Sequence, residues 1–282
     1  MIRKLKKFAA VIAAVTIVTL SGCSTAPPNG MMSYDFKEMS NDFIQLSAPK
    51  DGDTVAVFDT DYGEIRAVLY EEYAPNKVKS FIEKANAGYY NDSAVKGVQN
   101  DVYFIAGGKL NDKGQYIGRE SDSELMLNEY TPELWPFTGA LLGFSEKSGY
   151  CDARWLVCNN DAENLTAEAI NKLKSSAANI EDETERAKTR ELFDKFYEAG
   201  GVFGMAGEYT IFGQTYLGFD VVDKLTHIPA GEDGQASAEV KIKSVTISTF
   251  KDGDKVEEFP LLHPEGLPEG GESSADSGQS AE

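Results

Sequence analysis

Short runs of β-branched and aromatic residues recur along this chain, and they constrain its fold more than any other feature. Two of them, 54–60 and 64–70, are joined through Asp-Tyr-Gly, which is a hairpin signal. Five more follow between clusters of Gly, Asn and Asp, at 102–106, 139–144, 154–158, 210–216 and 240–248. Such closely spaced strands are typical of an all-β sandwich or barrel. We therefore expect a mainly β domain.

Two segments interrupt the β pattern with helical signals. Pro75 can occupy the first turn of a helix, and Val78 and Phe81 fall on one helical face before Gly88 ends it. From 164 to 199 a longer helix-forming stretch has apolar residues at helical spacing in both halves, and Gly-Gly follows it. We expect this stretch to form two helices inserted into the β domain.

The N-terminal end has the composition of an export signal. Residues 1–7 carry four basic and no acidic side chains, and residues 8–20 are uncharged. This apolar run is shorter than the ~20 residues that a helix needs to cross a bilayer. It ends in Leu-Ser-Gly directly before Cys23, which resembles the bacterial lipobox. We expect a lipoprotein signal peptide over 1–22 and lipid on Cys23; the alternative is an uncleaved anchor helix with an incidental cysteine.

The remaining composition suggests the domain boundaries. Residues 23–52 begin with a small, polar, proline-containing stretch that suits a lipid-anchored tether and extension. Residues 251–282 form a C-terminal extension that we expect to be disordered from about residue 264, where Gly, Ser, Pro and acidic residues dominate. The body at 53–250, with roughly 200 residues, is long enough for one domain with a sizeable core.

Charge limits the classes of partner. The formal net charge is −19, and loss of residues 1–22 removes four basic and no acidic residues. Nucleic acid and anionic lipid are therefore poor partners, and the acidity is typical of a soluble surface. We expect lipid on Cys23 to hold the protein at the bacterial cell membrane, with the domain outside the cytoplasm.

The remaining cysteines and the histidines indicate little special chemistry. In an exported protein Cys151 and Cys158 can form a disulfide; the alternative is a buried strand residue at Cys158 and a loop thiol at Cys151. His227 and His263 lie far apart without a partner pattern, so we predict no metal site.

An ordered set of motifs resembles the cyclophilin-type peptidyl-prolyl cis-trans isomerases. Ala-Pro-Asn-Lys-Val-Lys-Ser-Phe at 74–81, followed by Gly-Tyr-Tyr at 88–90, is similar to the family's first helix and the strand after it. Tyr-Phe-Ile-Ala-Gly-Gly at 103–108 and the segment 209–224, which begins Tyr-Thr-Ile-Phe-Gly, resemble later elements. The matches keep the family's order from about 53 to 249, outside the helical insert.

The resemblance implies a fold and an activity. The fold would be a closed eight-stranded antiparallel barrel with two capping helices and a peptide groove on its outer face. The activity would be rotation of the amide before proline, which has a barrier of ~18–20 kcal/mol. A catalyst holds the proline in an apolar groove and donates a hydrogen bond that favours the twisted amide, with no cofactor. The partners would be proline-containing segments of exported proteins.

The matched positions also indicate substrate-binding residues. The six candidates are Tyr103, Phe104, Phe144, Leu156, Met205 and Tyr209. Tyr209 stands where many members of the family have His. Aromatic residues and leucines on strands are often core residues, which is the alternative for Tyr103, Phe104 and Leu156. Trp155 should face away from Leu156 and belong to the core.

The family's catalytic arginine is absent from its usual place. The matching stretch reads Val-Lys-Gly-Val at 95–98, so Gly97 holds the arginine position. Arg154 is the first candidate for a replacement donor, because it shares a strand face with Leu156. Lys96, beside the vacated position, is the second.

Several alternatives stay open at this point. Arg154 can instead pair with a surface acid such as Asp152 or Glu146. The domain can be an active isomerase with a relocated donor, a weak or inactive module that binds proline-containing segments, or a scaffold with a filled groove. Because the insert at 164–199 replaces a loop that in the family runs beside the groove, we expect it to limit which peptides enter.

Overall fold

The computed structural model describes residues 38–268. The expected signal peptide at 1–22, the lipidation site Cys23 and the C-terminal residues 269–282 lie outside this range.

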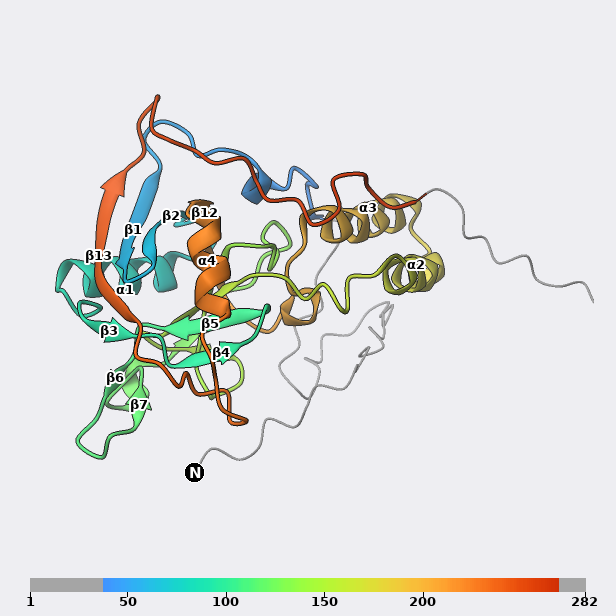
Figure 1. Cartoon of the computed structure of the whole chain (residues 1–282). Coiled ribbons are helices and arrows are strands. Elements are labelled where there is room, and N and C mark those ends of the chain that lie inside the picture. The colour runs from blue at the N-terminus through green and yellow to red at the C-terminus, as the bar shows by residue number, and fades with distance from the viewer. Residues whose placement is uncertain (1–37, 269–282) are drawn as a thin grey trace, which may run out of the picture.

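One curled antiparallel sheet carries the fold (Figure 1). Its nine strands are β1 (Thr54–Thr60), β2 (Gly63–Leu69), β3 (Ser93–Ala94), β4 (Gly97–Gln99), β5 (Tyr103–Ala106), β9 (Ala140–Gly143), β11 (Trp155–Cys158), β12 (Ile211–Leu217) and β13 (Lys241–Thr249). Their spatial order is β3-β13-β1-β2-β12-β9-β11-β5-β4. All seven strands expected from the sequence are present, with ends shifted by one residue at most.

The two edges of this sheet approach each other through consecutive residues. Between β3 and β4, the Val95 N–H donates to the Val240 carbonyl at 2.9 Å and the Lys96 N–H donates to the Ile105 carbonyl at 3.0 Å. The chain thus passes from beside β13 to beside β5. The structure shows a mainly β, curled sheet of nine strands whose edge strands β3 and β4 are not paired with each other, so the expected closed barrel of eight strands is not shown.

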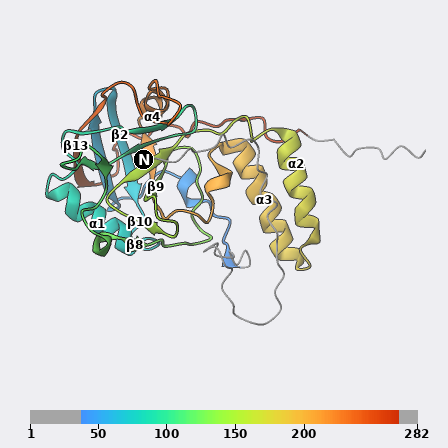
Figure 2. The same ribbon diagram turned by 90° about the horizontal axis from the view of Figure 1, so that it is seen from below.

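Two helices cover the curled sheet, α1 (Pro75–Asn86) and α4 (Phe219–Thr226). Val78 and Phe81 on α1 are fully buried, as their helical spacing predicts. Figures 1 and 2 show the helices at separate sides of the sheet. We call the apolar interior that the sheet and helices enclose the inner core.

Alternation along the strands decides which residues enter the inner core. Trp155 on β11 is 1% exposed, and its ring centroid lies 5.0 Å from that of Phe58 and 6.0 Å from that of Phe104. The prediction that Trp155 is a core residue is therefore confirmed.

The insert forms the two helices expected from its sequence, α2 (Ala167–Ser176) and α3 (Glu183–Ala199), with the 3-10 turn η4 (Ala177–Asn179) between them. Thr166 and Asp182 cap them, each side chain accepting a hydrogen bond from a backbone N–H three residues on. Gly200 ends α3 at φ 73°, a left-handed conformation that suits glycine.

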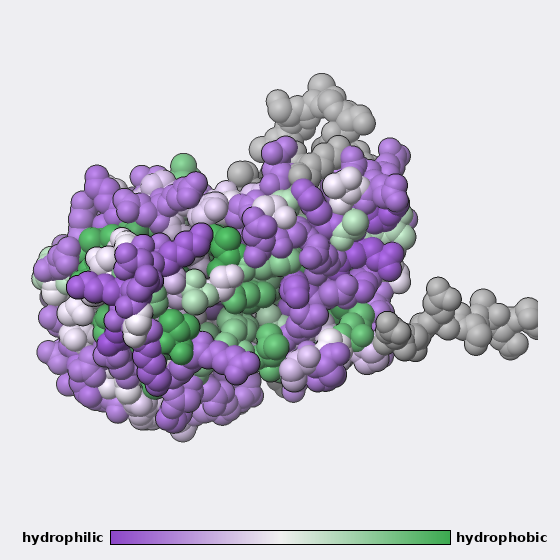
Figure 3. All heavy atoms as spheres, turned by 90° about the horizontal axis from the view of Figure 1, so that it is seen from above, coloured by the Kyte–Doolittle hydropathy of each residue, from purple (hydrophilic) through white to green (hydrophobic). Residues whose placement is uncertain are grey.

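A second core joins this insert to both ends of the described chain. Its buried members include Phe196 on α3 and, from before η2 (Ile44–Leu46), Met39 and Phe43, and Leu267 from the C-terminal segment packs against the cluster. Figure 3 shows hydrophobic residues in the hollow between the sheet-bearing part and the insert. Leu267 lies just after the start of the stretch that we expect to be disordered, and it is partly buried against this core.

The short elements were not expected from the sequence. They are β6 (Lys109–Leu110) with β7 (Tyr116–Ile117), β8 (Met126–Leu127) with β10 (Tyr150–Cys151), η3 (Asp122–Glu124) and η5 (Phe203–Met205). Cys151 and Cys158 are both buried and unpaired, so the free-thiol alternative holds, with Cys151 in a strand. Across residues 38–268, the helices are too short or too polar to span a membrane.

Candidate functional site

The outer face of β5, β9 and β11 carries a second apolar surface, which we call the outer cluster. Leu156 and Cys158 belong to it, while Trp155 and Val157 between and beside them face the inner core. The buried members of the outer cluster are Val102, Leu134, Ala140, Leu142, Leu156, Cys158, Val202 and Ile211.

The structure brings five of the six substrate-binding candidates together here. Leu156 is 1% exposed and forms part of the floor. The other four, Tyr103, Phe144, Met205 and Tyr209, are half-buried and pack against it. They come from separate segments of the chain, so their meeting depends on the fold rather than on sequence proximity.

Phe104 is the exception and needs correction. It is fully buried in the inner core, with its ring against that of Trp155. Adjacent strand residues point to opposite faces, so Tyr103 and Phe104 could not both line one surface. Ile105 takes the second position on the outer face, beside the outer cluster. The alternation that relates Arg154 to Leu156 would have identified Ile105 from the sequence.

A row of rings borders the outer cluster. The rings of Phe144 and Tyr209 are stacked, with centroids 6.5 Å apart. Burial raises the pKa of the Tyr209 phenol to about 12, so it is neutral and can donate a hydrogen bond. The Arg154 guanidinium carbon lies 5.1 Å from the Phe144 ring centroid.

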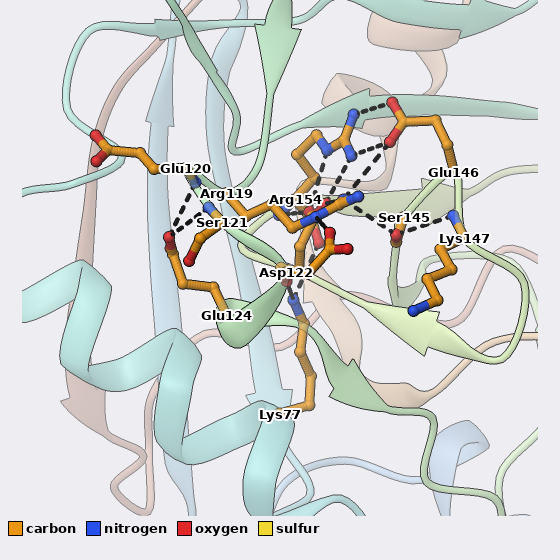
Figure 4. Close-up of polar contacts among 11 residues, drawn as sticks. Lys77, Arg119, Glu120, Ser121, Asp122, Glu124, Ser145, Glu146, Lys147 and Arg154 are labelled. Carbon is orange, nitrogen blue, oxygen red and sulfur yellow. Dashed lines mark hydrogen bonds and ion pairs between the residues drawn. The ribbon is translucent and has the colours of Figure 1, made fainter.

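Arg154 is held by two carboxylates (Figure 4). Its Nε and Nη2 donate to the Asp152 carboxylate at 3.0 and 2.6 Å, and its Nη1 and Nη2 donate to the two oxygens of Glu146. The side chain is only 2% exposed. The structure therefore shows the pairing that was the alternative for Arg154, and its role as a catalytic donor stays a prediction.

Asp152 is the fixed centre of this arrangement. Its side chain is fully buried, and Arg119 Nη1 donates to it at 3.0 Å. A Cβ on Gly118 would lie 1.9 Å from Asp152 Oδ1, so only glycine fits beside the pair. Burial alone would raise the pKa of Asp152, but the hydrogen bonds and charge of Arg154 outweigh it and lower that pKa.

Lys77 holds the backbone of the segment that carries Asp152 and Arg154. Its fully buried Nζ donates to the carbonyl of Asp152 at 2.7 Å and to the carbonyl of Arg154 at 3.0 Å. Burial lowers the pKa of this lysine. Because both carbonyls are tied to one group on α1, the backbone that carries Asp152 and Arg154 is held firmly against the inner core.

Two hollows flank the loop that carries Glu146. One, of about 290 Å³, is lined by Tyr116, Arg119 and Arg154 among others. The other, of about 230 Å³, is lined by Tyr209 and by neighbouring polar residues. Glu146 lines both, and its side chain is 62% exposed.

A comparison with known sequences shows to which protein family this chain belongs. The family model described as cyclophilin type peptidyl-prolyl cis-trans isomerase/CLD matches residues 55–247, which include every strand of the large sheet except the ends of β1 and β13. The chain belongs to this family. Its helical insert lies inside the matched range, whereas the N-terminal part of the second core lies before it.

The cyclophilin relationship also extends to individual proteins. Peptidyl-prolyl cis-trans isomerase-like 2 of Rhizopus delemar is 25% identical over 186 residues, which are 66% of this chain but only 27% of that protein. Two crystal structures of a Cryptosporidium parvum cyclophilin-type isomerase are also similar. One, in the presence of the dipeptide Ala-Pro, has 17% identity and a TM-score of 0.48; the other has 18% and 0.49. The matches cover 70% and 71% of this chain and 99% of each of those chains.

Gly97, which we expect at the position of the cyclophilin arginine, faces the outer surface. A Cβ on Gly97 would lie 2.8 Å from Ile105 Cδ1, so residue 97 is next to the outer face of β5. Lys96 precedes it and is half-buried. The structure gives Lys96 no polar side-chain partner within residues 38–268, and its role as second donor candidate stays a prediction.

Metal-binding side chains do not gather in the part of the chain that the structure describes. Among residues 38–268, no group of three or more His, Cys, Asp or Glu side chains is placed to hold an ion. His227 instead pairs with Asp101, its Nε2 lying 2.7 Å from a carboxylate oxygen.

Proposed function

We propose that this cyclophilin-type domain catalyses cis-trans isomerisation of Xaa-Pro bonds in exported proteins, with the proline ring held on the outer cluster. The observation that carries the proposal is the meeting of Tyr103, Phe144, Leu156, Met205 and Tyr209 on one apolar surface. A rigid aromatic and aliphatic surface binds a proline ring at little cost in conformational entropy.

Beyond binding of the proline ring, the reaction needs little from the protein. Rotation of the prolyl amide makes and breaks no covalent bond, so no nucleophile, base or metal is required. A donor that binds the twisted amide better than the planar one lowers the barrier. Arg154, next to Phe144, is the first candidate, and Lys96 is the second.

A second candidate function has its own support. By resemblance Gly97 stands in the usual arginine position, and Arg154 already donates to Asp152 and Glu146. A domain with this surface and no donor placed to bind the twisted prolyl amide would bind proline-containing segments without accelerating their isomerisation. Binding and catalysis are therefore measured separately.

Binding to the outer cluster is tested by removing one aromatic ring. Tyr103→Ala should weaken binding of a short Xaa-Pro peptide by about 5- to 30-fold, the effect of losing an anchoring aromatic contact. Tyr62→Ala is the matched control, because Tyr62 is 41% exposed and lies at the β1–β2 turn. Titration by NMR chemical shifts gives both affinities. Equal affinities for the two variants would place the peptide elsewhere.

We extend the proposal to the cell envelope on the strength of the Leu-Ser-Gly-Cys sequence that ends at Cys23. Cys23→Ala should release the protein from the membrane fraction or leave its precursor unprocessed. Fractionation followed by detection of precursor and mature forms measures both. Normal processing together with normal membrane retention in this variant would contradict lipidation.

A further inference from the structure

The two carboxylates that hold Arg154 differ in how firmly they are fixed. Asp152 is fully buried and also binds the Arg154 backbone N–H at 2.9 Å and Arg119 at 3.0 Å. Glu146 is 62% exposed, and among residues 38–268 its ion pairs are those with Arg154 and Arg119. Of the two, Glu146 can leave without exposing a buried charge.

Glu146 binds the two terminal nitrogens of the Arg154 guanidinium, at the end that faces the hollows. An arginine has five N–H groups, and here four of them donate to Asp152 and Glu146. If Glu146 moved away, one N–H group on Nη1 and one on Nη2 would become available, in addition to the second Nη1 N–H, which has no acceptor among residues 38–268. Nε and the other Nη2 proton would stay on Asp152, so the guanidinium would keep its orientation.

The released donors would lie beside the proposed proline site. The Arg154 guanidinium carbon is 5.1 Å from the Phe144 ring, and Phe144 stacks on Tyr209 at the border of the outer cluster. The balance of charge would also change. Without Glu146, the cations Arg119 and Arg154 would share one fixed carboxylate, that of Asp152. The pair would attract the partial negative charge on a carbonyl oxygen.

From this geometry we infer that Glu146 is a positioning residue that withholds the Arg154 donors from substrate, so that peptide must displace it before Arg154 can act. The inference rests on the proposed isomerase function and names the contact that limits it. The rate of an enzyme is proportional to the fraction of its molecules in the competent form, so a competent form that is only partly populated lowers the rate. Loss of the Glu146 carboxylate should raise this fraction.

The test compares two glutamates that border the same hollow. Glu146→Ala should raise kcat/KM for a short Xaa-Pro peptide by about three- to tenfold, the range for releasing a partly exposed ion pair. Glu120→Ala removes the same charge from the same lining, but within residues 38–268 Glu120 forms no ion pair with an arginine, so the rate should not change. In an Arg154→Lys background, Glu146→Ala should give no gain.

Salt dependence separates this effect from a general change in structure. Raising the ionic strength weakens an exposed ion pair, so the wild-type rate should rise with salt and the Glu146→Ala rate should not. A wild-type isomerase that Glu146→Ala does not accelerate would overturn the inference and leave the function intact. Equal gains from Glu120→Ala, or a gain that persists in the Arg154→Lys background, would also overturn it. Absence of both binding and isomerisation in every variant would instead refute the proposed function.

Discussion

At the scale of single residues, the structural role of Arg154 and its proposed catalytic role compete for the same donors. As a structural cation it neutralises buried Asp152, and its own pKa is raised because the hydrogen bonds to both carboxylates outweigh its burial. As a catalyst it would need at least one of these N–H groups for substrate. Deleting the side chain would leave Asp152 buried with Arg119 as its remaining charged partner, and breaking such a pair costs about 3–5 kcal/mol. A substitution that keeps the charge is therefore the better test.

Arg154→Lys should preserve the fold and lower the isomerase rate by about 10²-fold, while peptide affinity changes much less. The lysine keeps a positive charge beside Asp152 but loses the fork of donors that reaches two partners at once. Isomerase assays and peptide titrations on the same preparation measure the two effects. Lys96→Ala is the companion variant. If Arg154→Lys is as active as the wild type and Lys96→Ala is inactive, Lys96 is the donor.

The outer cluster also shows what could be predicted at this scale. Tyr103 and Leu156 were identified by family resemblance, and the structure places both on one surface. Phe104 was misplaced because the resemblance was applied without the two-residue period of a strand. Lys77 could not be predicted as a buried group, since its neighbours along α1 are exposed or apolar and its partners are carbonyls 75 and 77 residues away.

At the scale of elements, local sequence patterns were sufficient for the long strands and for α1, α2 and α3, whereas α4 was expected from the family resemblance. The long elements bury one face along a regular period, and the period is visible in the sequence. The two-residue strands were missed, because two residues have no period and their pairing depends on loops that meet only after folding. For the same reason the sequence could not show that the short strands β3 and β4 form the edges of the sheet.

Phe196 on α3 tests whether the insert is an integral part of the structure. Its buried ring lies 4.7 Å from that of Phe137 and 5.0 Å from that of Phe203, centroid to centroid. Phe196→Ala should lower the free energy of unfolding by about 3–5 kcal/mol, the usual effect of removing a buried phenyl ring. Urea unfolding measures this loss. Arg190→Ala, at an exposed position on the same helix, should stay within about 0.5 kcal/mol of the wild type; a similar loss in both variants would contradict the second core.

At the scale of the whole molecule, the second core and the outer cluster share the segment after α3. Gly200 and Gly201 connect α3 to Val202 and Met205, which belong to the outer cluster, while Phe203 packs into the second core. The insert therefore adjoins the proposed proline site through one short segment. We still expect it to influence peptide choice. Sequence could not show that the segment before η2 packs on the insert, because those contacts join positions roughly 150 residues apart.

We propose above all that this cyclophilin-type chain accelerates rotation of Xaa-Pro bonds on its outer cluster. NMR exchange spectroscopy on a short Xaa-Pro peptide measures it directly, because the spontaneous exchange takes tens to hundreds of seconds. We predict that a catalytic amount of wild-type protein increases the rate of exchange between the cis and trans peaks, and that Tyr103→Ala loses most of this increase while Tyr62→Ala retains it. An exchange rate equal to the spontaneous one, at a protein concentration that visibly shifts the peptide resonances, would contradict the isomerase account and establish a binding module in its place.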